Sequence, residues 1–177
     1  LGTLESGRVS LKELSRFSNE PLRDGDGIYW NIPALIEGVR NGLVKAGTLG
    51  HPITSVSADA WGVDYVLIDN KGEIMEPVFH YRHPRTIDGE KKALVKVDWP
   101  MLFDETGVQY MLLNTSIQLC SEVPDRLGMA NTILTIADAF NYILSGVAKI
   151  EVSMASTTQL YNSRLNCWSD RLIKDLG

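Results

Sequence analysis

The chain has 177 residues, of which 44% are hydrophobic and 22% are charged, a balance typical of a soluble globular domain with its own core. Its formal net charge of −5 is spread along the chain and forms no basic stripe, so nucleic acid is not expected as a partner. No apolar stretch reaches the length of a membrane span, and Cys120 and Cys167 are too isolated to suggest a disulfide framework or a zinc site. These features indicate a single cytoplasmic domain over residues 1–177 with no membrane partner.

The amino-terminal part of the chain predicts a strand, a connection and a helix. Alternating apolar residues over 8–17 predict the strand, and the polar segment 19–27, with its glycines and proline, predicts the connection. The helix should follow Asn31, whose side chain can cap it, because Pro33 then falls in the first turn, where its missing N–H costs little. Gly47 should end this helix.

Residues 53–81 predict β structure. The stretch 53–69 is rich in β-branched and aromatic residues but is interrupted at Trp61 and Gly62, and a tight turn at 69–72 leads into a further strand at 74–81. Three strands in succession suggest a meander.

Helical patterns dominate the rest of the chain. We expect a helical segment after Thr86, a short helix over 99–105, a longer helix over 132–144 that ends at Gly146, and a last short helix after Trp168. Strands followed by helices indicate the α/β class, with a largely mixed sheet flanked by helices.

The opening string LGTLESGR combines residues that suit an anion. Gly2, Ser6 and Gly7 can form a flexible turn whose backbone N–H groups approach a phosphate closely. Ser6 and Arg8 add a hydroxyl and a guanidinium group. Taken alone, the same residues also fit an ordinary β-turn with a solvated arginine.

The string ADAWGVDY at 58–65 combines residues that suit a sugar. Gly62 allows a ligand to approach the main chain, and Trp61 offers a flat apolar wall. Asp59 and Asp64 offer hydrogen-bond acceptors that could orient a polyol. The alternative is that Trp61 and Tyr65 are core aromatic residues flanking a bulge, and that the aspartates are exposed at a strand end.

The string HYRHPRT at 80–86 places two arginines at the end of a strand. Arg82 and Arg85 could hydrogen-bond sugar hydroxyls, or could act as structural salt-bridge partners. The three histidines, His51, His80 and His83, lack clustered ligands, so no metal site is assigned to them.

Taken together and in order, these strings resemble the rhamnulokinase branch of the FGGY carbohydrate kinase family along nearly the whole chain. The resemblance extends to GDGIYWNI at 25–32, GVQYMLLNTSIQL at 107–119 and ASTTQLYNSRLNCWSD at 155–170. It implies an actin-like, ribonuclease-H-like amino-terminal domain of a sugar kinase. It also implies ATP and Mg²⁺ as cofactors, and L-rhamnulose as the sugar that is phosphorylated at its terminal hydroxyl.

The resemblance implies roles for individual residues. The residues implied for the ATP phosphates are Glu5, Ser6, Gly7 and Arg8. The residue implied for the sugar is Gly62, and we assign to the sugar its neighbours Trp61, Asp59 and Asp64 and, from the string at 80–86, Arg82. The family's catalytic base lies in a carboxy-terminal domain, so this chain would contain no catalytic residue.

The chain begins without a methionine and is too short for two lobes, so we expect it to be truncated at both ends. It would then lack the aspartate that precedes the first leucine in the family, and the carboxy-terminal domain. In isolation it should show no kinase activity, and its uncovered apolar surface should promote self-association. The alternatives are a non-catalytic sugar-binding or assembly module, and a kinase for a related ketose such as L-fuculose or L-xylulose.

Overall fold

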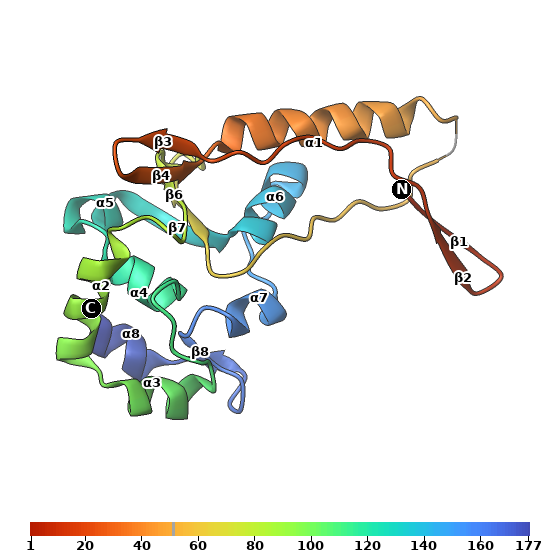
Figure 1. Ribbon diagram of the computed structural model, residues 1–177. Coiled ribbons are helices and arrows are strands. Elements are labelled where there is room, and N and C mark those ends of the chain that lie inside the picture. Colours follow the sequence, from red (N-terminus) through yellow and green to blue (C-terminus); the bar gives the residue numbers. More distant parts are fainter. Residues whose placement is uncertain (51) are drawn as a thin grey trace. The chain divides into compact units, whose positions relative to one another are not determined.

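The computed structural model describes residues 1–50 and 52–177, so His51 lies outside the described residues. Unit 1 consists of Leu1–Pro21 with Asn31–Ser57, and unit 2 consists of Leu22–Trp30 with Ala58–Gly177. Figure 1 shows the helices and strands of these two compact units, labelled where there is room. Within the described ranges, no helix is long and apolar enough to cross a membrane.

Unit 1 begins with a two-stranded antiparallel hairpin, β1 (Gly2–Glu5) and β2 (Arg8–Leu11). Ser6 and Gly7 in its turn both have positive φ, 48° and 75°, a combination whose twist suits a tight hairpin. The predicted strand over 8–17 is wrong beyond Leu11. β2 ends at Leu11, opposite Gly2, and beyond this pair Leu1 and Lys12 exchange two further backbone hydrogen bonds of 2.9 Å.

The long helix of unit 1, α1 (Ile32–Gly47), confirms the helix predicted from the sequence. The side chain of Asn31 caps it by accepting a hydrogen bond from the Ala34 amide at 3.2 Å, and a proline occupies the first turn. Gly38 lies inside the helix, at a position where a Cβ would come within 2.5 Å of the Phe17 ring. The absence of a side chain at Gly38 therefore lets the Phe17 ring pack directly on the helix backbone.

Unit 2 contains three small sheets, and all of their strand pairings are antiparallel. The first has the order β3 (Leu22–Asp24), β4 (Gly27–Trp30) and β6 (Val78–Phe79). The second pairs β5 (Tyr65–Asp69) with β7 (Ala130–Thr135), and the third pairs β8 (Tyr161–Asn162) with β9 (Cys167–Trp168).

The hairpin of β3 and β4 corrects the prediction of a plain connection over 19–27. Its turn contains Gly25 with φ 54°, and Asp24 lies opposite Gly27. The two strands have only three and four residues, which is too short for an apolar alternation to be visible in the sequence.

The predicted meander is wrong, although its tight turn is confirmed. At the turn, the Gly72 amide donates to the Asp69 carbonyl at 3.1 Å. However, the segment after the turn forms only one isolated antiparallel bridge with β5, between Ile68 and Ile74, whereas β5 pairs along its length with the distant β7, and β6 pairs with β4. The described residues 52–60 contain no strand. Alternation along one segment does not identify its partner, and here both partners are remote in sequence.

The strand β7 also corrects the predicted helix over 132–144. Residues 132–135 pair with β5, where their β-branched side chains suit a sheet. The helix α6 (Ile136–Ser145) begins only after them and ends, as predicted, at Gly146, which has φ 74°.

The other helices of unit 2 are α2 (Thr86–Lys96), α3 (Trp99–Thr106), α4 (Thr115–Cys120), α5 (Pro124–Met129), α7 (Val152–Ser156) and α8 (Asp170–Leu176). The helices predicted after Thr86, over 99–105 and after Trp168 are thus confirmed. Four of them, α2, α3, α4 and α8, gather around one apolar core (Figure 1). The buried side chains of this core are Ala93, Val97, Leu102, Ile117, Leu172 and Leu176. Sheets and helices together give the expected α/β class.

Candidate functional site

The bend at residues 61–64, directly before β5, contains the glycine assigned to the sugar. Gly62 is half-buried, and a Cβ at this position would lie 3.3 Å from Oγ1 of Thr157. The next residue, Val63, has φ 69°, a left-handed conformation that is rare for a β-branched residue. The main chain at Gly62 is therefore closely packed against Thr157 on the side where a Cβ would project.

Asp64 is completely buried and binds two indole rings. Its Oδ2 accepts hydrogen bonds from Nε1 of Trp30 at 2.6 Å and from Nε1 of Trp61 at 2.9 Å. Its Oδ1 accepts a hydrogen bond from Nε2 of Gln118 at 2.9 Å. Burial raises the pKa of Asp64, against the opposing effect of the hydrogen bonds from Gln118 and the two indoles. The alternative of an exposed strand-end carboxylate is therefore wrong for Asp64.

A row of aromatic rings continues from this carboxylate. The ring centroids of Trp61 and Trp30 are 4.2 Å apart, and those of Trp30 and His80 are also 4.2 Å apart, in a stacked arrangement. Tyr81 follows, 4.3 Å from His80. Burial lowers the pKa of His80, and the charges of Arg82 and Arg23 lower it further, so the charged form of the stacked imidazole is disfavoured.

The two remaining residues assigned to the sugar are exposed. Arg82 follows the aromatic row, with its guanidinium 5.3 Å from the centroid of the Tyr81 ring, and its amide donates to Nδ1 of His80 at 3.0 Å. Asp59 lies on the segment before the bend. The structure thus brings together Trp61, Gly62 and Asp64, and it connects Arg82 to them through the aromatic row.

The four residues assigned to ATP phosphates lie in unit 1, in and beside the hairpin turn. Glu5, Ser6, Gly7 and Arg8 are all exposed. Ser6 and Gly7 both have positive φ, and turns of this kind can form an anion-binding concavity. This turn and the sugar residues lie in different units.

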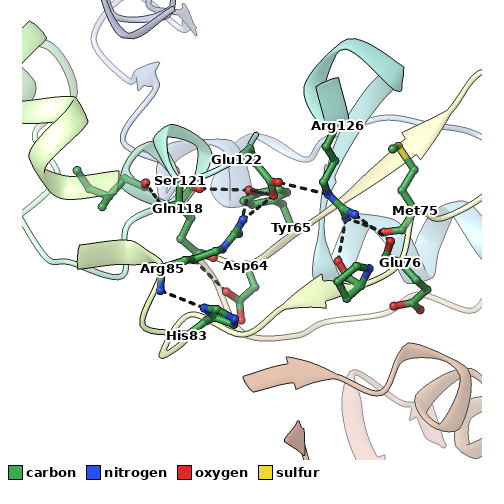
Figure 2. Close-up of polar contacts among 12 residues, drawn as sticks. Asp64, Tyr65, Met75, Glu76, His83, Arg85, Gln118, Ser121, Glu122 and Arg126 are labelled. Carbon is green, nitrogen blue, oxygen red and sulfur yellow. Dashed lines mark hydrogen bonds and ion pairs between the residues drawn. The ribbon is translucent and has the colours of Figure 1, made fainter. Parts of the chain in front are cut away.

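A buried ionic cluster contains Tyr65, the residue after Asp64, together with Arg85, Glu122 and Arg126 (Figure 2). The sequence alone did not predict this cluster. Tyr65 donates its hydroxyl hydrogen to Oε1 of Glu122 at 2.7 Å, and Nη1 of Arg85 lies 2.8 Å from the same oxygen. Nε of Arg126 lies 3.3 Å from Oε2 of Glu122. Burial raises the pKa of Tyr65 above its ordinary range, so its hydroxyl remains a donor. The interpretation of Arg85 as a salt-bridge partner is confirmed.

Arg126 extends this cluster to the loop before β6 (Figure 2). Its guanidinium donates hydrogen bonds of 2.8 to 2.9 Å to the carbonyls of Met75, Glu76 and Pro77. The guanidinium of Arg85 also covers the Phe79 ring, 3.5 Å from its centroid. The cluster joins α2, α4 and α5 to the two main sheets, and we assign it to stability rather than to ligand binding.

A further cavity of unit 2 lies elsewhere and is apolar. It has a volume of about 500 Å³ and is lined mainly by side chains of β5, β7, α4 and α8, including Leu67, Leu119, Ile133 and Ile173. Such a lining offers few partners for sugar hydroxyls.

Over residues 1–50 and 52–177, no group of three or more His, Cys, Asp and Glu side chains is arranged to hold a metal ion. None of the described residues is therefore assigned to Mg²⁺.

Comparison with known proteins assigns the chain to a family. Residues 19–177 match the N-terminal domain of the FGGY family of carbohydrate kinases. A rhamnulokinase from Mannheimia succiniciproducens is 34% identical over 98% of this chain and 36% of its own length. A rhamnulokinase from Bacillus subtilis is 37% identical over 92% of this chain and 33% of its own length. The chain thus spans about a third of the length of these curated relatives.

Solved structures with the same fold are also sugar or polyol kinases. A ligand-bound xylulose kinase from Lactobacillus acidophilus superposes with a TM-score of 0.79 at 12% identity, over 90% of this chain and 34% of that chain. A glycerol kinase from Plasmodium falciparum with ADP gives a TM-score of 0.74 at 14% identity, over 89% of this chain and 34% of that chain. At these identities the likeness concerns the fold, which agrees with the predicted actin-like kinase domain. The chain belongs to the FGGY family of carbohydrate kinases and corresponds to its N-terminal domain.

Proposed function

We propose that this chain is the sugar-binding part of an ATP-dependent kinase that phosphorylates L-rhamnulose at its terminal hydroxyl. The observation that carries the proposal is the identity of about a third of its residues with proteins named rhamnulokinase, sustained over nearly the whole chain. Both units would belong to one functional domain over residues 1–177. We also propose a cytoplasmic setting, which suits the unpaired thiols of Cys120 and Cys167.

The sugar would bind at the Gly62 bend. Trp61 is half-buried, its indole N–H is taken by Asp64, and one side of its ring lies near Trp30. The accessible part of the ring can therefore offer only an apolar surface, which suits the C–H face of a sugar. Exposed Asp59 and Arg82 would supply hydrogen bonds to hydroxyls. In this proposal Asp64 acts indirectly, by orienting Trp61.

The phosphates of ATP would bind at the hairpin turn of unit 1. The amides of Ser6 and Gly7 and the exposed guanidinium of Arg8 are suited to phosphate oxygens. When bound, Mg²⁺ would neutralise charge on those phosphates. The base that deprotonates the sugar hydroxyl would lie in a carboxy-terminal domain, so this chain alone should bind sugar without turning it over. A coupled assay of ADP release that detects turnover by this chain would contradict that part of the proposal.

Calorimetric titration of the chain with L-rhamnulose, L-fuculose and L-xylulose tests the sugar assignment. L-rhamnulose should bind most tightly, and Gly62→Ala should weaken its binding by about tenfold or more because the added methyl would press on Thr157 and displace the main chain at the bend. Gly128→Ala is the matched control, since a Cβ at that position meets nothing within 4 Å. Tighter binding of another ketose would change the substrate, and no binding of any of the three would reject the proposal.

A further inference from the structure

The bend that carries Gly62 is strained at the next residue. Positive φ occurs at four non-glycine residues of the described chain, Ser6, Val63, Gln159 and Asn166. Of these, Val63 alone is β-branched, and its φ of 69° crowds its branched Cβ against the backbone. Such a conformation persists only where surrounding contacts hold it in place.

Two buried side chains of α4 supply those contacts. The Val63 carbonyl accepts hydrogen bonds from Oγ1 of Thr115 at 2.7 Å and from Nε2 of Gln118 at 3.1 Å. Thr115 is 3% exposed and Gln118 is fully buried, so neither side chain is available to a ligand. The two residues are three positions apart on one helix and therefore lie on the same face. Gln118 also binds the carboxylate of Asp64, so both residues that follow Gly62 are held by α4.

The same turn of α4 also binds residues 157–159, the segment that packs against Gly62. Thr157, which faces Gly62, is followed by Thr158, whose carbonyl accepts a hydrogen bond from the Ser116 amide at 3.1 Å. Next comes Gln159, which is fully buried with φ 61° and accepts a hydrogen bond from the Ser116 hydroxyl at 2.6 Å. The start of α4 thus fixes both segments that meet at Gly62, and each of them contains a strained residue.

We propose that Thr115 is a positioning residue for the sugar, and that it holds the strained Val63 so that the main chain at Gly62 is presented in one orientation. This inference rests on the proposed sugar site at Gly62. It goes further because Thr115 is buried and cannot contact the sugar, so its effect on sugar affinity must act through Val63. A main chain ordered before binding does not have to be ordered by the ligand, so release of Val63 should weaken binding.

Calorimetric titration with L-rhamnulose tests the role of Thr115. Thr115→Val removes the hydroxyl and should weaken binding by about tenfold or more, whereas Thr115→Ser keeps the hydroxyl and should stay within about threefold of wild type. Thr106→Val is the matched control because its buried hydroxyl also donates to a carbonyl, that of Leu102 at 2.7 Å, but lies in α3. Both valine variants should lower the midpoint of thermal unfolding, and only Thr115→Val should weaken sugar binding.

A second variant keeps the inference testable if Thr115→Val fails to fold. Glycine tolerates a positive φ, so Val63→Gly should leave the unfolding midpoint unchanged or raised, but it also admits more backbone conformations, so the main chain at Gly62 is less ordered and sugar binding should weaken. If wild type binds L-rhamnulose and both Thr115→Val and Val63→Gly bind it equally well, the positioning role is rejected while the proposed function stands. If wild type does not bind the sugar, the proposed function is rejected and the positioning role with it.

Discussion

Replacement of Glu122 by glutamine should strongly destabilise unit 2. The Glu122 side chain is 2% exposed, and its two arginine partners, Arg85 and Arg126, are 11% and 13% exposed. Glutamine has nearly the same size as glutamate but no charge, so the substitution leaves two guanidinium groups in a largely buried cluster without their carboxylate. The loss should therefore come from charge rather than from packing.

The magnitude follows from the surroundings of the two arginines. Removal of one partner from a buried ion pair generally costs about 3 to 5 kcal/mol. Arg126 keeps its three carbonyl acceptors in the loop before β6, and both guanidiniums have some access to water. We therefore expect the lower value, about 3 kcal/mol, which is a large part of the stability of an ordinary domain.

Urea unfolding followed by circular dichroism measures this loss. Asp88→Asn is the control, because Asp88 and its partner Lys91 are 75% and 71% exposed, and its effect should stay within about 0.5 kcal/mol. Arg85→Met should cost less in the Glu122→Gln background than in wild type, because the charge is then already unpaired. An unfolding free energy of Glu122→Gln within about 1 kcal/mol of wild type would refute the account of the cluster.

Three further results are expected. Burial raises the pKa of Asp64, so the folded state keeps the carboxyl proton to higher pH than the unfolded chain does. The contribution of Asp64 to the free energy of unfolding should therefore decrease as pH rises from about 4. Asp64→Asn should remove that part of the pH dependence in urea unfolding, and an unchanged slope would contradict the assignment. Gly89→Ala should destabilise the chain by about 1 to 2 kcal/mol in the same assay, because its Cβ would lie 2.3 Å from the Ile117 carbonyl oxygen, whereas Gly128→Ala should not. Exposed apolar side chains, such as Val95 at 88% and Met129 at 61%, predict concentration-dependent association in sedimentation velocity, and a monomer at every concentration would count against it.

The parts of the fold that the sequence predicted well are those determined by neighbouring residues. The cap at Asn31, the turn at 69–72 and the glycine stop at Gly146 depend on contacts within a few positions, and all three are confirmed. The strand at 132–135 was predicted as helix because its apolar residues continue the pattern of the helix that follows. Only its pairing with β5 makes it a strand, and that partner is remote in sequence.

The candidate site, too, was predictable only where it depends on residues that are neighbours in sequence. Trp61, Gly62 and Asp64 could be selected because they lie in one short string. The groups that position them could not, because Trp30 is 34 positions and Gln118 is 54 positions from Asp64. The burial of Asp64 could not be predicted from the adjacent residues either, because an aspartate before a strand is usually exposed. The available signal was indirect, a tryptophan in GDGIYWNI and a polar helix start in NTSIQL, both in strings already noted for their resemblance to the family.

The central claim, that L-rhamnulose binds against Trp61 at the Gly62 bend, is tested most directly by the indole N–H signals of the ¹⁵N-labelled chain. The chain has four tryptophans, which should give four such signals. Addition of L-rhamnulose should shift the signals of Trp61 and Trp30, whose N–H groups both bind Asp64, and should leave those of Trp99 and Trp168 in place. No shift at saturating sugar, or shifts confined to Trp99 and Trp168, would contradict the claim.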